Sequence, residues 1–255
     1  SPKLRSNKGE IFIMACNAGP DIIEDGLVFC LDAANKRSYL GSGTAWDDLA
    51  GDFSGVMTNG LSFDSGNGGK ILFDGSDEKV IGSCSPVKWH NWDKMSFTVI
   101  FNHTGITGQT GNRQYIVDFR HNGGINGALA LFVDDPSGTP DLTLFYNTTG
   151  TGYEEPTVYN YTLGEWITYT FTFDKTTSTN NIRHYINGEN VYNRSRTANS
   201  TTTDSGDNIT IGDYSSSYTG FLFNGYISFM AANTGIIFTP DQVRQNYEAT
   251  KGRYS

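Results

Sequence analysis

The chain has 255 residues, of which 37% are hydrophobic, 13% are aromatic and 18% are charged, and it contains 30 glycines. This length suffices to bury a core without cross-links, the aromatic content excludes a disordered chain, and the shortage of charged helix formers argues against a helical bundle. The formal net charge of -9 at pH 7 argues against a surface that neutralises phosphates, so neither nucleic acid nor an anionic membrane is an expected partner.

Residues 1–25 are predicted to be an arm or leader, with Met14 as the natural start. The alternative is a short basic segment that docks the acidic domain on a partner. The three cysteines, Cys16, Cys30 and Cys84, are odd in number and lack C-x-x-C spacing, so neither a disulfide framework nor a zinc cluster is predicted. No apolar run approaches the roughly 18 residues that span a bilayer, so membrane insertion is not expected.

From residue 26 onward, short runs rich in Val, Ile, Phe, Tyr and Thr are separated by clusters of Gly, Asn, Asp and Ser. Such spacing is typical of an all-β domain. In residues 166–173 the set Ile167, Tyr169, Phe171 and Phe173 alternates with threonines, which predicts one buried and one solvated face. The predicted strands are 27–32, 71–73, 79–83, 96–103, 114–120, 128–133, 142–147, 166–174, 182–186, 190–193, 208–212 and 225–231.

Two local signals define a hairpin and a helix. Asn187-Gly188 between two β-prone runs predicts a hairpin with a type I′ turn. After Thr239 as N-cap and Pro240 at the first position, Gln242 completes a capping box, which predicts one helix with Val243 and Tyr247 on its apolar side and Gly252 as its stop. Because no linker interrupts residues 26–255, we expect a single domain there.

Several segments carry a family resemblance. Residues 26–35 (GLVFCLDAAN) and 41–49 (GSGTAWDDL) resemble the opening of the laminin-G-like branch of the concanavalin A-like lectin/glucanase superfamily. Residues 71–80 (ILFDGSDEKV) are similar to that group's F-D-G-S-x-D-Y-V segment, with Glu78-Lys79 in place of a single aromatic residue. Further segments fit in the expected order, namely 164–166 (GEW), 185–188 (YING), 211–212 (IG) and 223–227 (FNGYI).

The resemblance implies a concanavalin A-like β-sandwich, or jelly roll, of two antiparallel sheets with one short C-terminal helix. It is specifically similar to versions in virion structural proteins of tailed phages, including phages of marine cyanobacteria. The expected role is therefore a non-enzymatic protein on the virion surface, a capsid decoration or appendage domain, made in the host cytoplasm. Its expected partners are phage capsid or tail proteins and host-surface polysaccharide. Copies on a symmetric particle favour a homo-oligomer.

The alternative is a stand-alone, lectin-like carbohydrate-binding module, and an enzyme is the third reading. A glycosidase needs two carboxyl groups that flank the scissile bond, and no predicted strand places acidic residues at alternate positions. A polysaccharide lyase needs a Tyr or His base with an Arg or Gln, residue types found in Gln114-Tyr115, Arg120-His121 and Arg183-His184. In the last two pairs the neighbours point to opposite faces of a strand.

Calcium is the cofactor that the resemblance suggests, since laminin-G-like and lectin sandwiches often carry it near loops. Aspartates in turns are candidate oxygen ligands, although their spacing does not resemble the Asp-x-Asp-x-Asp-Gly loop of an EF-hand. The alternative is that they are solvated turn residues without metal. The candidates are Asp118, Asp134, Asp135, Asp174 and Asp213.

Glycan binding would use aromatic side chains in polar, loop-like settings. Trp89 and Trp92 in the run WHNWD, and Tyr214 and Tyr218 in the run DYSSSY, are the candidates. The alternative is that the tryptophans close one end of the sandwich and that the tyrosines pack within their own loop.

Overall fold

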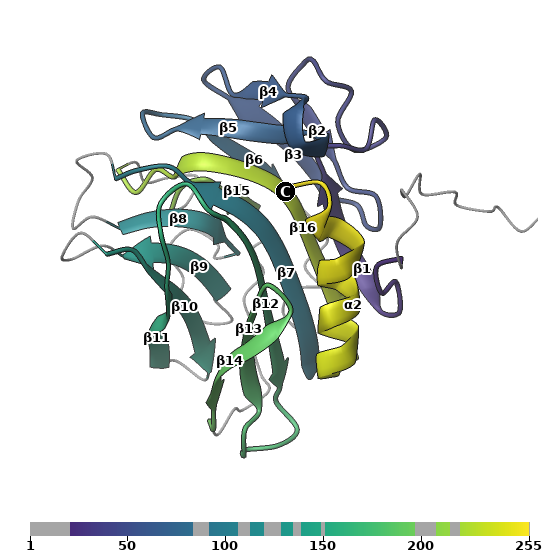
Figure 1. Ribbon diagram of the computed structural model, residues 1–255, viewed down its shortest axis with the longest axis vertical. Coiled ribbons are helices and arrows are strands. Elements are labelled where there is room, and N and C mark those ends of the chain that lie inside the picture. The colour runs from purple at the N-terminus through teal and green to yellow at the C-terminus, as the bar shows by residue number, and fades with distance from the viewer. Residues whose placement is uncertain are drawn as a thin grey trace, which may run out of the picture.

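The computed structural model describes residues 21–83, 92–106, 113–119, 129–134, 139–148, 151–196, 208–214 and 220–254. These residues form two antiparallel eight-stranded sheets that pack face to face, with one α-helix on the outside (Figure 1). This confirms the predicted fold class.

The first sheet, sheet A, has the order β14-β13-β12-β7-β16-β5-β4, and β1 also pairs with β16. The longest strands, β7 and β16, lie at its centre. Its strands are β1 (Leu27–Asp32), β4 (Ser62–Asp64), β5 (Lys70–Asp74), β7 (Lys94–His103), β12 (Trp166–Asp174), β13 (Ile182–Ile186), β14 (Glu189–Arg194) and β16 (Asn224–Thr234).

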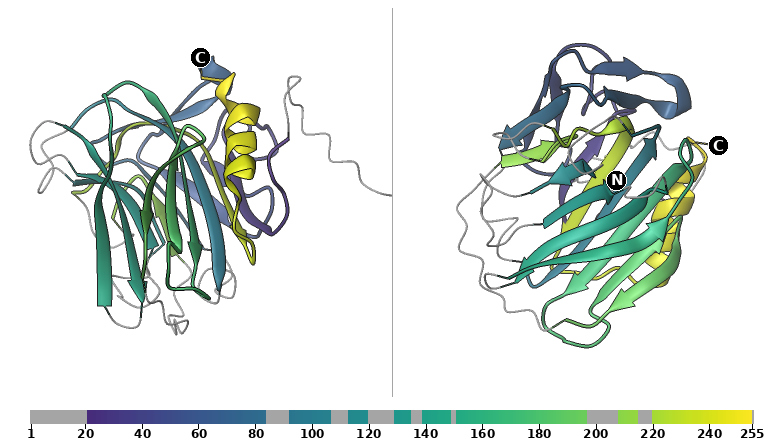
Figure 2. Two further views of the ribbon diagram at one scale, coloured as in Figure 1. Left: turned by 60° about the horizontal axis from the view of Figure 1, so that its bottom comes forward. Right: turned by 90° about the vertical axis from the view of Figure 1, so that its left-hand side faces the viewer.

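The second sheet, sheet B, has the order β11-β10-β9-β8-β15-β6-β3-β2. Figure 2 shows the two sheets as separate layers, with the helix on the outer side of sheet A. The strands of sheet B are β2 (Ala45–Asp47), β3 (Ser54–Thr58), β6 (Lys79–Ser83), β8 (Arg113–Asp118), β9 (Leu129–Asp134), β10 (Asp141–Thr148), β11 (Thr151–Asn160) and β15 (Asn208–Ile211).

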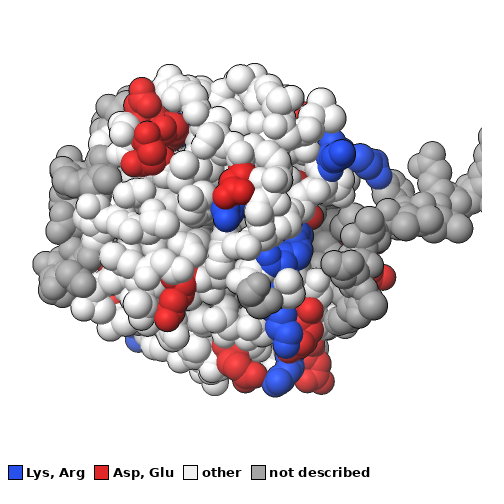
Figure 3. All heavy atoms as spheres, turned by 45° about the horizontal axis from the view of Figure 1, so that its top comes forward, with Lys and Arg blue, Asp and Glu red and all other residues white. Residues whose placement is uncertain are grey.

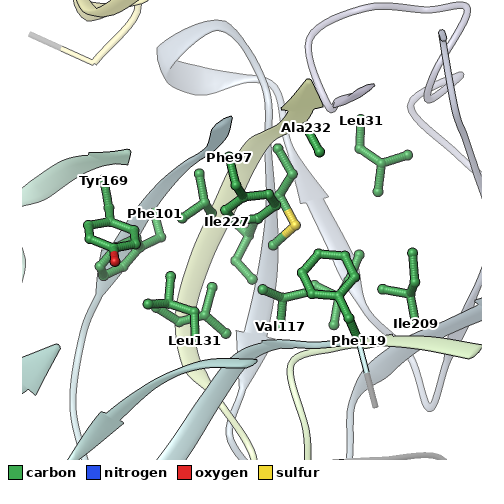
Figure 4. Close-up of a cluster of buried hydrophobic side chains, with 14 of the residues drawn as sticks. Leu31, Phe97, Phe101, Val117, Phe119, Leu131, Tyr169, Ile209, Ile227 and Ala232 are labelled. Atoms are coloured by element: carbon green, nitrogen blue, oxygen red, sulfur yellow. The ribbon is translucent and has the colours of Figure 1, made fainter. Parts of the chain in front are cut away.

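The core lies between the inner faces of the two sheets. Ile167, Tyr169, Phe171 and Phe173 of β12 all belong to it, as the alternation predicts. Figure 4 shows side chains from both layers meeting there, among them Phe97, Phe101, Val117 and Leu131. Because consecutive strand residues point to opposite faces, the period-two pattern of β12 assigns its four apolar side chains to the core.

The expectation of a solvated outer face on β12 is wrong. Thr168, Thr170 and Thr172 are all buried, with 5%, 1% and 1% of their surface exposed. The hydroxyls of Thr170 and Thr98 lie 2.9 Å apart and are hydrogen-bonded, which satisfies them away from water. The covering element is the helix α2 (Pro240–Lys251), which contacts β12 and β14.

The helix α2 begins as the sequence predicts but ends differently. The Thr239 side chain accepts from the Gln242 backbone N–H, and the Gln242 side chain accepts from that of Thr239, so the capping box is confirmed. Val243 is buried against Tyr185 and Phe238. Gly252 follows the helix at φ -63°, so the stop does not use the left-handed conformation for which glycine is favoured.

The predicted hairpin is also present, between β13 and β14. Asn187 has φ 50° and Gly188 has φ 83°, which are the two positive angles that a type I′ turn requires. A Cβ on Gly188 would approach the Tyr247 side chain of α2 to 3.2 Å, so the turn also packs against the helix.

The predicted domain division at residue 26 stays a prediction. The described residues just before it attach to sheet A, since Asn233 Nδ2 donates to the carbonyls of Ile23 and Asp25 at 3.1 and 2.8 Å. The predicted strand ends at Arg120 and Ala128 lie outside the described residues. Within the described ranges, no helix is long and apolar enough to cross a membrane.

Candidate functional site

The outer face of sheet B carries an aromatic cluster, the most distinctive feature among the described residues. Strand register places Tyr115 of β8 opposite Phe132 of β9, with ring centroids 4.9 Å apart. Around these two buried rings, Phe145, Tyr214 and Phe221 are half-buried. We use the name aromatic cluster for these five residues, which come from three strands and from the connection between β15 and β16.

The predicted residue Tyr214 belongs to this cluster. Its ring centroid lies 5.1 Å from that of Tyr115 and 5.4 Å from that of Phe221. The Tyr115 backbone N–H donates to the Phe221 carbonyl at 2.8 Å, which ties the segment before β16 to the cluster. Tyr214 therefore lies where aromatic side chains gather, and its role in binding stays a prediction.

A buried ion pair sets the position of Tyr214. Asp213 is fully buried, and its Oδ2 lies 3.1 Å from Nζ of Lys79. The other oxygen, Oδ1, accepts from the Tyr214 backbone N–H at 2.8 Å. Because a buried carboxylate needs a partner for each oxygen, these contacts hold the start of the loop rigidly.

Charged side chains flank the cluster on its other side. Arg113 and Asp134 face each other in register and form a bidentate pair, with N–O distances of 2.8 and 2.9 Å. The Arg113 guanidinium also lies 4.1 Å from the Phe132 ring centroid. This geometry combines ring surface with donors and acceptors that remain partly exposed, the combination that sugar hydroxyls and C–H faces require.

Trp92 lies in a different place, before β7 at the border of the core. Its ring packs edge-on against Phe173 at 5.5 Å, and Nζ of Lys175 lies 3.6 Å from its centroid. Burial lowers the pKa of Lys175 to about 8, against the opposing effect of Asp93. The side chain of Trp92 therefore packs against the core, which favours the alternative interpretation of this residue, and its role in glycan binding stays a prediction. Trp89 and Tyr218 lie outside the described residues.

The calcium candidates do not come together. Asp134 pairs with Arg113, Asp213 pairs with Lys79, and Asp174 caps its own turn by accepting from the Thr176 backbone N–H at 2.9 Å. Across the described residues, no three acidic, His or Cys side chains form a group suited to a metal ion. Asp118 is buried, and Asp135 lies outside the described ranges.

The lyase candidates are also dispersed. Gln114 is buried, and its Oε1 lies 3.2 Å from Nε2 of His103, whose Nδ1 lies 3.0 Å from the Tyr161 hydroxyl. His184 is buried beside Tyr169, while Arg183 points to the other face. His121 and Arg120 lie outside the described residues.

One carboxyl pair was not anticipated from the sequence. Glu78 and Asp74 share a hydrogen bond at the turn between β5 and β6, and the Asp74 backbone N–H also donates to Glu78 Oε2 at 3.2 Å. Burial, reinforced by Asp74, raises the pKa of Glu78, and the hydrogen bond from Glu78 lowers that of Asp74. Since Glu78 is 7% exposed, the pair stabilises a turn rather than presenting an acid to a substrate.

Two signals in the sequence point to the aromatic cluster. Residues 129–133 (LALFV) form a continuous apolar run, which indicates that both faces of β9 are covered. Tyr115 stands at an alternate position from Arg113 on β8 and so shares its outer face.

Comparison with protein-family models gave no match, and comparison with curated proteins gave none either. Solved structures do resemble the chain. Domain 4 of AbnA, a GH43 extracellular arabinanase from Geobacillus stearothermophilus solved in complex with arabinotriose, matches with a TM-score of 0.63 and 15% identity. The match covers 88% of this chain and 100% of that domain.

Botulinum neurotoxins are similar as well. A structure of type C, whose cell entry depends on two ganglioside molecules, matches with a TM-score of 0.65 and 12% identity over 87% of this chain and 51% of that one. The binding domain of neurotoxin DC in complex with SialylT gives a TM-score of 0.64 at 12% identity, over 88% and 51%. The chain thus spans about half the length of the neurotoxin chains it matches. At these identities the likeness establishes the fold alone, a β-sandwich of two antiparallel sheets.

Proposed function

We propose that this protein is a non-enzymatic carbohydrate-binding module and that the aromatic cluster on sheet B is where it contacts a glycan. The observation that carries the proposal is the grouping of Tyr214, Phe221 and Phe145, half-buried on an outer sheet face beside the Arg113–Asp134 pair. Structural neighbours that bind gangliosides or arabinotriose support it by analogy.

Each part of the surface has a separate role in this proposal. The Tyr214 and Phe221 rings stack against the C–H face of a sugar, and Arg113 and Asp134 exchange hydrogen bonds with its hydroxyls. The net charge of -9 disfavours highly anionic glycans, because long-range repulsion slows their approach. Neutral or weakly charged polysaccharides are the expected class.

The test is a glycan array with the purified chain, followed by calorimetry on the glycan retained. Tyr214→Ala and Phe221→Ala should each weaken binding at least about tenfold, as loss of a central aromatic contact does. Tyr192→Ala is the matched control, since Tyr192 is half-buried on β14 of sheet A and contacts His184 rather than the cluster. The proposal fails if the array retains nothing, or if the cluster variants bind as the parent protein does.

The cellular setting of the module remains our sequence-based proposal. A component of a tailed-phage particle that binds host-surface glycan would combine both predicted roles, with capsid or tail proteins as partners and several copies assembled together. Cryo-electron microscopy of particles that contain this chain tests that placement, and its absence from them would leave the module without a virion role.

A further inference from the structure

The outer face of sheet A carries a second aromatic surface, next to the C-terminal residues that follow the covering helix. Trp166 of β12 lies opposite Asn102 of β7, and Asn102 lies opposite Tyr226 of β16. Since neighbouring strands are about 4.8 Å apart, these three side chains form a short lateral row. We call them, with Tyr254, the sheet A row.

The C-terminal residues complete this row. The Tyr254 ring lies 4.5 Å from that of Trp166 at an interplanar angle of 32°, and the Trp166 and Tyr226 rings lie 6.4 Å apart. The Tyr254 hydroxyl is 2.6 Å from Ser228 Oγ on β16. Figure 1 accordingly places the C-terminal end of the chain beside β16. All three rings are half-buried, so each retains surface that solvent can reach.

The position of Tyr254 is fixed by its neighbour as well. Arg253 makes a bidentate ion pair with Asp32, with N–O distances of 2.6 and 3.1 Å. Burial raises the pKa of Tyr254 to about 12, so its hydroxyl remains protonated at neutral pH. Tyr254 is therefore held in place before any ligand arrives, which lowers the entropic penalty of binding.

The side chain of Asn102 gives a second indication, independent of the rings, that a ligand binds here. It is 7% exposed, and its Nδ2 donates to the Gly164 carbonyl at 2.7 Å. Its Oδ1 is hidden from solvent and has no hydrogen-bond partner. Almost all buried acceptors in folded proteins have a donor, so an unpaired one directly between two half-buried rings indicates a donor that the ligand brings.

The charges around the row restrict what that ligand is. Lys70 Nζ lies 4.8 Å from the Tyr226 ring centroid and 3.1 Å from Asp64 Oδ2, so its charge is already paired. Figure 3 shows one side of the molecule as mostly uncharged, with its basic groups interspersed with acidic ones. Of the described cations at the row, Lys70 and Arg253 are both already paired, which disfavours a phosphate or uronate. A neutral sugar needs only ring surface and hydrogen-bonding groups.

From these observations we infer that the sheet A row is a second binding surface, for the neutral sugar units of a glycan. It rests on the proposed function but uses different residues on the opposite face of the sandwich. A sugar stacks on Trp166 and Tyr226, and one of its hydroxyls donates to Asn102 Oδ1, which a small shift of the neighbouring side chains makes accessible. The chain then holds two sugars on two faces.

The experiment follows the tryptophan indole N–H signals by nuclear magnetic resonance during titration with arabinotriose, maltotriose and cellotriose. Trp→Phe variants assign the signals. We expect the Trp166 signal to shift with at least one of the three sugars, and to shift equally in Tyr214→Ala, because that variant alters only the aromatic cluster. Trp166→Ala should halve the number of sugars bound per chain in calorimetry.

Asn102→Leu separates binding from folding. Leucine keeps a similar volume but removes both the unpaired acceptor and the bond from Nδ2 to Gly164, so the variant should stay folded with a modestly lower melting temperature. Affinity at this surface should fall at least tenfold, measured at a temperature where the variant is fully folded. If the Trp166 signal stays fixed while sugar binds and Tyr214→Ala abolishes that binding, the sheet A row is not a site, although the proposed function stands. If neither these sugars nor a glycan array gives binding, both proposals are overturned.

Discussion

The two outer faces of this sandwich are built in different ways. On sheet A, an α-helix covers part of the outer face, since α2 packs against Tyr185. Residues 21–25 attach to β16 on the same sheet. On sheet B no described helix packs on the outer face, and aromatic side chains from strands and loops cover it instead. Both outer faces of the sandwich are therefore partly covered, by a helix on sheet A and by aromatic side chains on sheet B. Beside each covered region, half-buried aromatic rings still reach solvent.

The largest expected effect comes from breaking the anchor of the sheet B face. Asp213→Ala leaves the Lys79 ammonium buried without its carboxylate, and loss of one partner of a buried pair destabilises by about 3–5 kcal/mol. It also removes the acceptor that positions the Tyr214 backbone. Urea unfolding measures the first effect and glycan affinity the second.

An exposed ion pair provides the control for that variant. Arg244 and Glu189 join α2 to β14 at 2.8 Å, but their side chains are 62% and 68% exposed. Arg244→Ala should therefore change the free energy of unfolding by less than about 0.5 kcal/mol. Equal losses in the two variants would mean that the Lys79–Asp213 pair does not anchor the sheet B face.

A smaller effect is expected from loosening the cover of sheet A. Thr239→Ala removes the capping hydroxyl of α2 and should lower stability by about 1 kcal/mol. Amide hydrogen exchange should accelerate at Thr170 and Tyr185, which α2 covers, and remain unchanged at Tyr115 on sheet B. Thr239→Ser retains the hydroxyl and should restore protection. Uniform acceleration across both sheets would show that α2 is not a local cover.

The same contrast explains which features the sequence could predict. The alternation in β12, the Asn187-Gly188 turn and the capping box are local signals, and each appears in the structure. The sequence does not predict β2, β3 and β4 because these short runs (AWD, SGVMT and SFD) contain Ala, Gly, Ser and Asp, residues that are not typical of strands. β11 was missed because Pro156 and adjacent acidic residues disguise it, although an edge strand tolerates proline.

The candidate sites depend on pairing that no local pattern contains. Tyr214 was found because it lies in a polar loop, but its partner Tyr115 lies about a hundred residues earlier on a different strand. The sheet A row needs the register of β12, β7 and β16, and a shift by one residue would turn each side chain to the other face. Both sites therefore depend on contacts between residues far apart in the chain, which no local sequence pattern contains.

The smallest expected effect concerns the turn between β5 and β6, which joins the two sheets. The folded pKa of Glu78 is raised above its ordinary value of 4.5, so its contribution is complete below that value and is lost as the pH rises through the folded pKa. The folded pKa of Asp74 is lowered below 3.8, so its contribution is present above 3.8 and is lost as the pH falls through the folded pKa. Stability from this pair is therefore greatest in mildly acidic solution and smaller at pH 7.

Glu78→Gln should remove that dependence, because an amide donates to Asp74 without needing a proton. The variant is expected to match the parent protein near pH 4.5 and to exceed it slightly at pH 7, measured by urea unfolding across pH 4 to 8. Asp74→Asn should instead lose stability above pH 4, where the carboxylate acceptor is otherwise present. If Glu78→Gln were less stable than the parent at pH 7, the shared proton would not be what holds this turn between the two sheets.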